Sequence, residues 1–111
     1  MEVEVLVGQE FKRQFKRLAK KYHTLRDDFV EWKNDLMIHP LAGDDLGNGV
    51  RKMRMAIKAK GKGKSGGARI LTLDAKVSED GLTIILLTIY DKGEISNVKD
   101  EYIKYLIEQL Y

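Results

Sequence analysis

The chain has 111 residues, of which 43% are apolar and 33% charged, which suits one folded domain over residues 1–111 and excludes a disordered chain. The net charge of +3 makes the molecule mildly basic, and the absence of cysteine excludes disulfides and thiolate metal sites. The chain has only two histidines, so no metal site or cofactor is expected. No apolar run approaches the ~20 residues of a membrane span, so we expect a cytoplasmic protein without a membrane segment.

The first third of the chain predicts a strand followed by two helices. In residues 2–7 glutamate alternates with valine, which is the period-2 pattern of a strand. Apolar side chains then recur at helical spacing over residues 9–22 and again over residues 25–37. So short a connection predicts an antiparallel helical hairpin packed on the sheet.

Details of these helices give further predictions. Thr24 followed by Asp27 predicts a capping box at the start of the second helix, and Pro40 is expected to end it. Trp32 lies on the apolar stripe, which favours a core position over a base-stacking surface. The basic coat of the first helix is either a solvated surface or an extension of a polyanion-binding surface.

The rest of the chain predicts strands and a last helix. Residues 41–49 are expected to form a loop whose Asn48-Gly49 turns into the next strand. Strands are predicted on both sides of a glycine-rich loop and again over residues 82–90, and Asn97 is expected to cap a C-terminal helix. The predicted order is β-α-α-β-β-β-α, an α+β fold with a small antiparallel sheet, an N-terminal helical hairpin and a C-terminal helix.

The stretch from residue 50 to 73 contains only basic charges. Met53 and Met55 alternate with Lys52 and Arg54, which places these two cations on the face opposite the apolar side chains. The loop that follows alternates lysine with glycine. So much uncompensated charge costs self-repulsion and indicates a polyanion ligand, by default RNA or DNA. The cations expected to bind RNA are Arg51, Lys58, Lys60, Lys62 and Lys64.

Three functions fit such a loop in principle. A nucleotide phosphate loop is excluded, because Gly63-Lys64-Ser65 lacks the required preceding glycine and the loop joins two strands. A passive nucleic-acid-binding loop is supported by charge alone. An RNA-cleaving site needs a proton acceptor for the 2′-hydroxyl, cations for the phosphorane and a donor for the leaving oxygen. Arginine serves as a clamp, a crowded lysine as a weak base, and Tyr90 as a proton donor, a stacking surface or a core residue at the sheet rim.

Four segments carry a resemblance that spans nearly the whole chain: FKRQFKRLAKKYHTLRDDF, RKMRMAI, GKGKSGGARIL and LLTIYDKGEISNV. The most specific piece is KSGGARIL. Together with the order of elements, they resemble the RelE/ParE superfamily of toxins, especially its RelE- and HigB-like branch. The resemblance implies the toxin of a toxin–antitoxin pair, a metal-independent endoribonuclease that cleaves mRNA on the ribosome and inhibits translation. It implies a cognate antitoxin, mRNA and the ribosome as partners.

The same resemblance implies site residues. The two cations of the family's second strand match Lys52 and Arg54, and the arginine after the glycine turn, which contacts the scissile phosphate, matches Arg69. Lys92 matches the cation after the last strand, and Tyr90 precedes it. A second basic residue expected after Lys92 is missing, and the position of a family tyrosine near the last helix holds lysine. A ParE-like gyrase inhibitor and a non-catalytic nucleic-acid-binding module are the alternatives.

Overall fold

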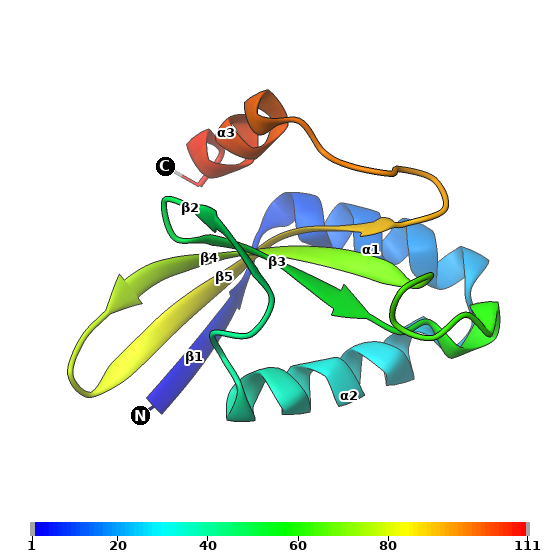
Figure 1. The fold of residues 1–111 in the computed structure, drawn as a ribbon, viewed down its shortest axis with the longest axis horizontal. Coiled ribbons are helices and arrows are strands. Elements are labelled where there is room, and N and C mark those ends of the chain that lie inside the picture. Colours follow the sequence, from blue (N-terminus) through cyan, green and yellow to red (C-terminus); the bar gives the residue numbers. More distant parts are fainter. Residues whose placement is uncertain (1, 111) are drawn as a thin grey trace.

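A computed structural model describes residues 2–110 as an α+β fold built on one five-stranded sheet (Figure 1). The elements are β1 (Glu2–Val7), α1 (Gln9–Lys21), α2 (Leu25–Ile38), β2 (Asp44–Gly47), β3 (Val50–Met55), the short 3₁₀ helix η1 (Lys58–Lys60), β4 (Ala68–Val77), β5 (Gly81–Asp91) and α3 (Asp100–Glu108). The strand order is β1-β5-β4-β3-β2. The predicted α+β architecture, with a helical hairpin before the central strands and a helix after them, is confirmed.

The sheet has one more strand than the sequence predicted. Asp44–Gly47, expected within a loop, pairs antiparallel with the start of β3 as β2. All four of its residues are exposed, so no apolar alternation marks it in the sequence. The predicted turn at Asn48 and Gly49 is present, and both residues have positive φ angles (55° and 81°). The sheet is mixed, because β1 runs parallel to β5 while the other neighbours are antiparallel.

Two predicted helix caps are wrong. The Thr24 hydroxyl caps no amide of α2 but donates to the buried carboxylate of Asp28, at 2.7 Å, and accepts the backbone N–H of Ala59. Asp28 also accepts the backbone N–H of Lys58, so these side chains join α2 to η1. α3 begins at Asp100, and Asn97 accepts only the N–H of the next residue.

The two helices of the hairpin cover one face of the sheet. Their apolar stripes meet those of the strands in a core that contains Phe11, Leu18, Trp32, Met55 and Ile84. Trp32 therefore lies in the core, as predicted. No helix within residues 2–110 is long and apolar enough to cross a membrane.

α3 lies on the other face of the sheet, away from α2 (Figure 1). Its Leu106 packs with Leu71, Leu73 and Leu87. The β4–β5 register shifts after Leu71, and Leu87 is the residue of β5 that is left without a register partner there. Leu86 packs in the first core and Leu87 in the second. The end of this face that is nearer the glycine-rich loop carries the cations described next.

Candidate functional site

Three of the predicted site residues form one row across three strands. Arg54 of β3 is the Cα partner of Arg69 in β4, and Arg69 is the Cα partner of Tyr90 in β5. Lys52 lies two residues before Arg54 and so leaves the same face of the sheet. Arg54 is exposed and Lys52 half-buried, whereas Arg69 and Tyr90 are 6% and 4% exposed. The structure thus brings together Tyr90 and three residues that the resemblance implies, Lys52, Arg54 and Arg69.

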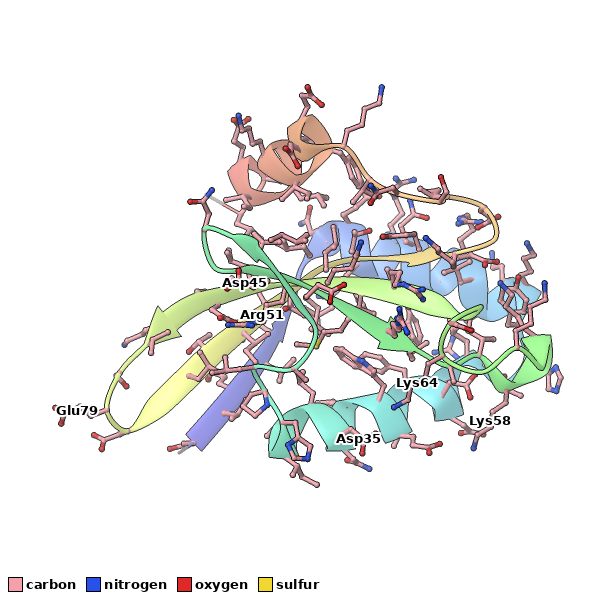
Figure 2. All side chains as sticks on the ribbon, in the orientation of Figure 1. Asp35, Asp45, Arg51, Lys58, Lys64 and Glu79 are labelled. Atoms are coloured by element: carbon pink, nitrogen blue, oxygen red, sulfur yellow. The ribbon has the colours of Figure 1, made fainter. Side chains whose placement is uncertain are left out.

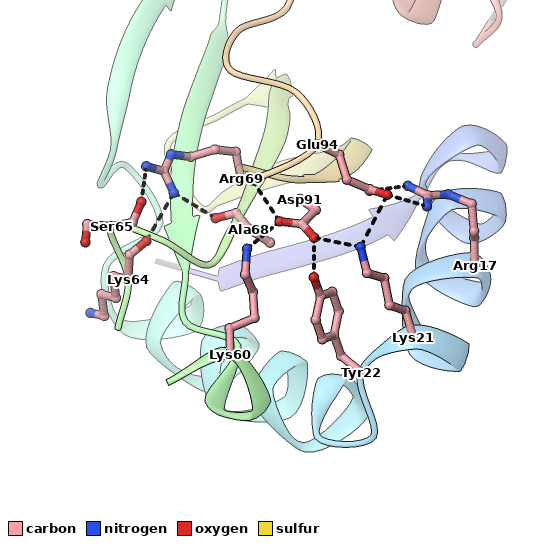
Figure 3. Close-up of polar contacts among 11 residues, drawn as sticks. Arg17, Lys21, Tyr22, Lys60, Lys64, Ser65, Ala68, Arg69, Asp91 and Glu94 are labelled. Carbon is pink, nitrogen blue, oxygen red and sulfur yellow. Dashed lines mark hydrogen bonds and ion pairs between the residues drawn. The ribbon is translucent and has the colours of Figure 1, made fainter. Parts of the chain in front are cut away.

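The guanidinium of Arg69 organises the glycine-rich loop, which we define as residues 61–67. Its Nη1 donates to the carbonyl oxygens of Lys64 (3.1 Å) and Ala68 (3.2 Å), and its Nη2 donates to that of Ser65 (3.0 Å), as Figure 3 shows. Within residues 2–110 it pairs with no carboxylate. Arg69 therefore keeps its full charge for an anion while its fork holds the loop.

Tyr90 belongs to the second core and borders Arg69. Burial raises the pKa of the Tyr90 hydroxyl, and the positive charge of Arg69 offsets part of that rise. The hydroxyl therefore stays protonated at neutral pH and is suited to donate a proton rather than to accept one. A position for Tyr90 at the rim of the sheet, as the sequence predicted, is compatible with the donation of a proton.

The remaining predicted cations have different environments. The Nζ of Lys92 donates to the Ser96 carbonyl at 2.5 Å, so its side chain follows the segment after β5. Arg51 leaves the opposite face from Lys52 and pairs with Asp74 at 3.3 Å. Lys62 is exposed, and no carboxylate within residues 2–110 forms an ion pair with it.

Lys58 and Lys64 lie on the side of the loop that faces α2 (Figure 2). Lys58 is exposed and pairs with Glu31 of α2 at 3.1 Å. A cavity of about 590 Å³ separates α2 from β3 there, with Trp32 and Met53 among its apolar lining and Arg54 among its charged lining. The cationic face thus borders a hollow of mixed charge beside the free edge of β3, because four acidic side chains also line it: Asp28, Glu31, Asp35 and Asp44.

A buried carboxylate at the end of β5, Asp91, lies behind this face. Asp91 is 1% exposed and accepts hydrogen bonds from the Tyr22 hydroxyl, from Lys60 Nζ at 2.5 Å and from the Gly93 N–H at 2.9 Å (Figure 3). Burial alone would raise the pKa of Asp91, but the hydrogen bonds from Lys60, Tyr22 and Gly93 lower it to about 2. Lys60, expected to bind RNA, has a side chain only 10% exposed because of this pair.

A second layer of charges surrounds Asp91. Lys21 lies 3.7 Å from Asp91 and 3.6 Å from Glu94, and Arg17 donates to both carboxylate oxygens of Glu94. Part of the basic coat of α1 is thus paired with the segment after β5. One sequence signal for the buried pair existed, namely an aspartate directly after the most apolar run of a chain whose centre is purely basic.

This arrangement can stabilise negative charge without a metal. Two arginines and a lysine share one face, and a protonated tyrosine lies at the end of their row. No group of three histidine, aspartate or glutamate side chains within residues 2–110 is placed to hold a metal ion. Such a face can bind a phosphodiester, stabilise a phosphorane and protonate a leaving oxygen.

The chain matches a known protein family over most of its length. The family described as the RelE toxin of the RelE / RelB toxin-antitoxin system matches residues 9–109. The matched range includes both helices of the hairpin, the cationic row, the glycine-rich loop and α3.

Proposed function

The chain belongs to the RelE toxin family, and on that premise we propose that it is a metal-independent endoribonuclease that cleaves mRNA on the ribosome and so inhibits translation. The observation that supports this function most is the row of Arg54, Arg69 and Tyr90 across adjacent strands, with Lys52 on the same face. Cations and a proton donor are the kinds of group that cleavage by the RNA's own 2′-hydroxyl uses, and their position on one face supports the proposal.

In the proposed reaction the 2′-oxygen attacks the adjacent phosphorus, and the bond between phosphorus and the 5′-oxygen breaks. Arg54 and Arg69 stabilise the charge that develops on the phosphorane, and Tyr90 gives its proton to the leaving 5′-oxygen. Lys52 and Lys92 are the candidates for accepting the 2′ proton. The products are a 2′,3′-cyclic phosphate and a 5′-hydroxyl.

The loop takes part in this proposal. Arg69 donates to three carbonyl oxygens in the free protein, and a phosphate oxygen is a stronger acceptor because it carries a full negative charge. The guanidinium has five N–H groups and these carbonyls take three, so we propose that the scissile phosphate accepts the other two, on Nε and Nη2, while the carbonyls of Lys64 and Ser65 keep Arg69 in place. Exposed Lys62 and Lys64 then bind neighbouring phosphates.

The family implies an antitoxin partner. Exposed cations attract RNA of any sequence, so we propose that the antitoxin covers Lys52, Arg54 and the loop lysines with an acidic, amphipathic segment. The proposed target places the activity in the cytoplasm, where ribosomes translate. Co-purification of the untagged protein from the neighbouring gene tests this partner, and a chain that is harmless when expressed alone and has no stable partner contradicts it.

Expression of the protein without a partner, followed by mapping of RNA ends in the arrested cells, tests the enzymatic function. Growth arrest with mRNA fragments that end in a 2′,3′-cyclic phosphate is expected, and magnesium chelation is not expected to protect RNA beyond its effect on the ribosome. Intact messages together with gyrase-dependent DNA breaks support a ParE-like gyrase inhibitor instead. RNA binding without cleavage supports a non-catalytic binding module.

A further inference from the structure

We propose that Asp91 is a positioning residue that clamps both ends of the glycine-rich loop and thereby holds Arg69 at the proposed site. Asp91 is buried behind the sheet's loop end and contacts neither the exposed side of Arg54 nor the open loop. The anchoring of the loop stands on geometry alone, whereas its effect on turnover rests on the proposed endoribonuclease function.

The first end of the loop is held through Lys60. This residue ends η1, and the next residue is the first of the loop. Its Nζ donates to Oδ1 of Asp91 and lies 5.8 Å from the ring centre of Tyr22. A buried ammonium with one carboxylate partner is fixed strongly, because separating the two leaves an unpaired buried charge. The loop therefore leaves η1 from a fixed point.

The other end of the loop is held where β4 meets β5. Ala68, the residue after the loop, is the Cα partner of Asp91, and the carbonyl of Gly67 accepts the N–H of Lys92 at 3.0 Å. Gly67 fits closely against β3, since a Cβ there would lie 2.2 Å from the Met55 carbonyl oxygen. The turn after β5 is held as well, because the Gly93 N–H donates to the same oxygen of Asp91 that Lys60 contacts.

The groups that face Asp91 come from three parts of the fold: the end of α1, η1 and the turn after β5. Tyr22 follows α1, Lys21 ends α1, Lys60 belongs to η1 and Gly93 follows β5. The carboxylate thus holds the start of the loop through Lys60, whereas the backbone of residues 91 and 92 holds its end. Arg69 donates hydrogen bonds to carbonyls in the middle of the same loop. If either end of the loop becomes mobile, these carbonyls move and no longer fix the orientation of the guanidinium.

A residue with this role affects turnover more than binding. The exposed cations that attract RNA, such as Arg54 and Lys62, do not contact Asp91, so the affinity for RNA is expected to stay within about twofold when Asp91 changes. The guanidinium of Arg69 must meet the developing charge to within a fraction of an ångström, and misplacement by about 1 Å costs on the order of 10²-fold in rate. Loss of the clamp is therefore expected to lower kcat and to leave KM nearly unchanged.

The test compares Asp91→Asn with Tyr22→Phe in the full chain. Asp91→Asn keeps the shape but removes the charge that holds Lys60, whereas Tyr22→Phe removes one hydrogen bond to the same carboxylate and leaves the ion pair. The first measurement is amide hydrogen exchange over residues 61–67, which requires no activity. Faster exchange there in Asp91→Asn, with Tyr22→Phe close to wild type, is expected, and unchanged loop exchange in Asp91→Asn overturns the proposal.

The second measurement is kcat and KM for cleavage of ribosome-bound mRNA by folded protein. A drop in kcat of about 10-fold to 100-fold is expected for Asp91→Asn, and the wild-type value for Tyr22→Phe. A double variant, Asp91→Asn with Lys60→Met, removes the unpaired buried charge but not the need for a clamp, so it should regain thermal stability without regaining kcat. If kcat follows thermal stability across the three variants, Asp91 is merely structural and the proposal falls. If the wild type cleaves no RNA, the proposed function fails while the exchange measurement still decides the clamp.

Discussion

Arg54 and Arg69 lie directly opposite each other in the antiparallel register of β3 and β4. Like charges in such positions repel, so the free protein holds this pair at a cost in stability of roughly 0.2–1 kcal/mol. Arg54→Thr should therefore raise the free energy of unfolding by about that amount while weakening RNA cleavage. Urea unfolding and a cleavage assay on the same preparation measure the two effects. A variant that is less stable than wild type contradicts the repulsion.

Arg69→Ala should reduce cleavage by roughly 10²–10³-fold, because it removes a clamp that acts on the charge of the transition state. Arg69→Lys should recover little, since an ammonium cannot span the carbonyls of Lys64 and Ser65 that the fork holds. Growth arrest on induction and RNA cleavage in vitro are the measurements. Lys62→Ala is the matched control; Lys60 is unsuitable, because its ammonium is buried against Asp91. A folded Arg69→Ala protein that still arrests growth would show that the site is wrongly assigned.

Loss of an exposed loop cation should change the salt dependence of RNA binding rather than the chemical step. Lys62→Ala and Lys64→Ala should each lower the slope of log affinity against log salt by about 0.7, the value for one phosphate contact on single-stranded RNA. Binding titrations at several salt concentrations measure the slope. Lys99→Ala, a change in an exposed lysine before α3, serves as the control for charge outside the loop. Equal slopes for all three variants would mean that only net charge matters.

Stability should fall at acidic pH through Asp91. The pKa of this carboxyl is lowered from 3.8 to about 2, so the unfolded chain takes up the proton first as the pH falls. Asp91 therefore adds about 2 kcal/mol to the free energy of unfolding. This contribution is fully present above pH ~4–5 and disappears as the pH falls from about 4 to about 2. Urea unfolding between pH 2 and pH 7 measures it. In Asp91→Asn the free energy of unfolding should change less with pH over this range. The acid destabilisation that remains comes from Glu10 and Glu94, whose pKa values are also lowered.

Gly67→Ala should destabilise the protein more than Gly61→Ala. A Cβ at Gly67 would meet the backbone of Met55 and Ile57 at 2.2 Å and 3.0 Å, so β3 and β4 must separate, at about 3 kcal/mol. Gly61 has open space around it and a φ of +69°, so alanine there costs only about 1 kcal/mol of backbone strain. Thermal unfolding of the two variants compares them. Equal losses would argue against the close contact at Gly67.

The sequence predicted those parts of the fold that periodic patterns determine. The apolar stripes of α1 and α2, the alternation around Met53 and the run that became β5 all place their residues correctly. β2 was missed because its exposed residues pair through the backbone alone. The cap predicted at Thr24 is wrong because its hydroxyl donates to Asp28, four residues on, which also binds η1.

The candidate site divides in the same way. Strand register follows from turns and alternation, so the meeting of Arg54, Arg69 and Tyr90 was within reach of the sequence. The pairing of Lys60 with Asp91 was not, because 31 residues separate them and only the closed sheet brings them together. Lys60 and Lys62 are each followed by a glycine, so their local sequences are similar. Only that tertiary contact buries the ammonium of Lys60 and leaves Lys62 exposed.

The parallel pairing of β1 with β5 constrains the order in which the molecule can assemble. Glu2 pairs with Gly81 and Val7 with Leu86, so the sheet cannot close until most of the chain has been synthesised. Contacts this distant in sequence form late, because the loop between them must first be ordered. A nascent chain that ends before residue 81 therefore carries both arginines on strands that lack β5. It has neither Tyr90 beside them nor Asp91 to hold the loop.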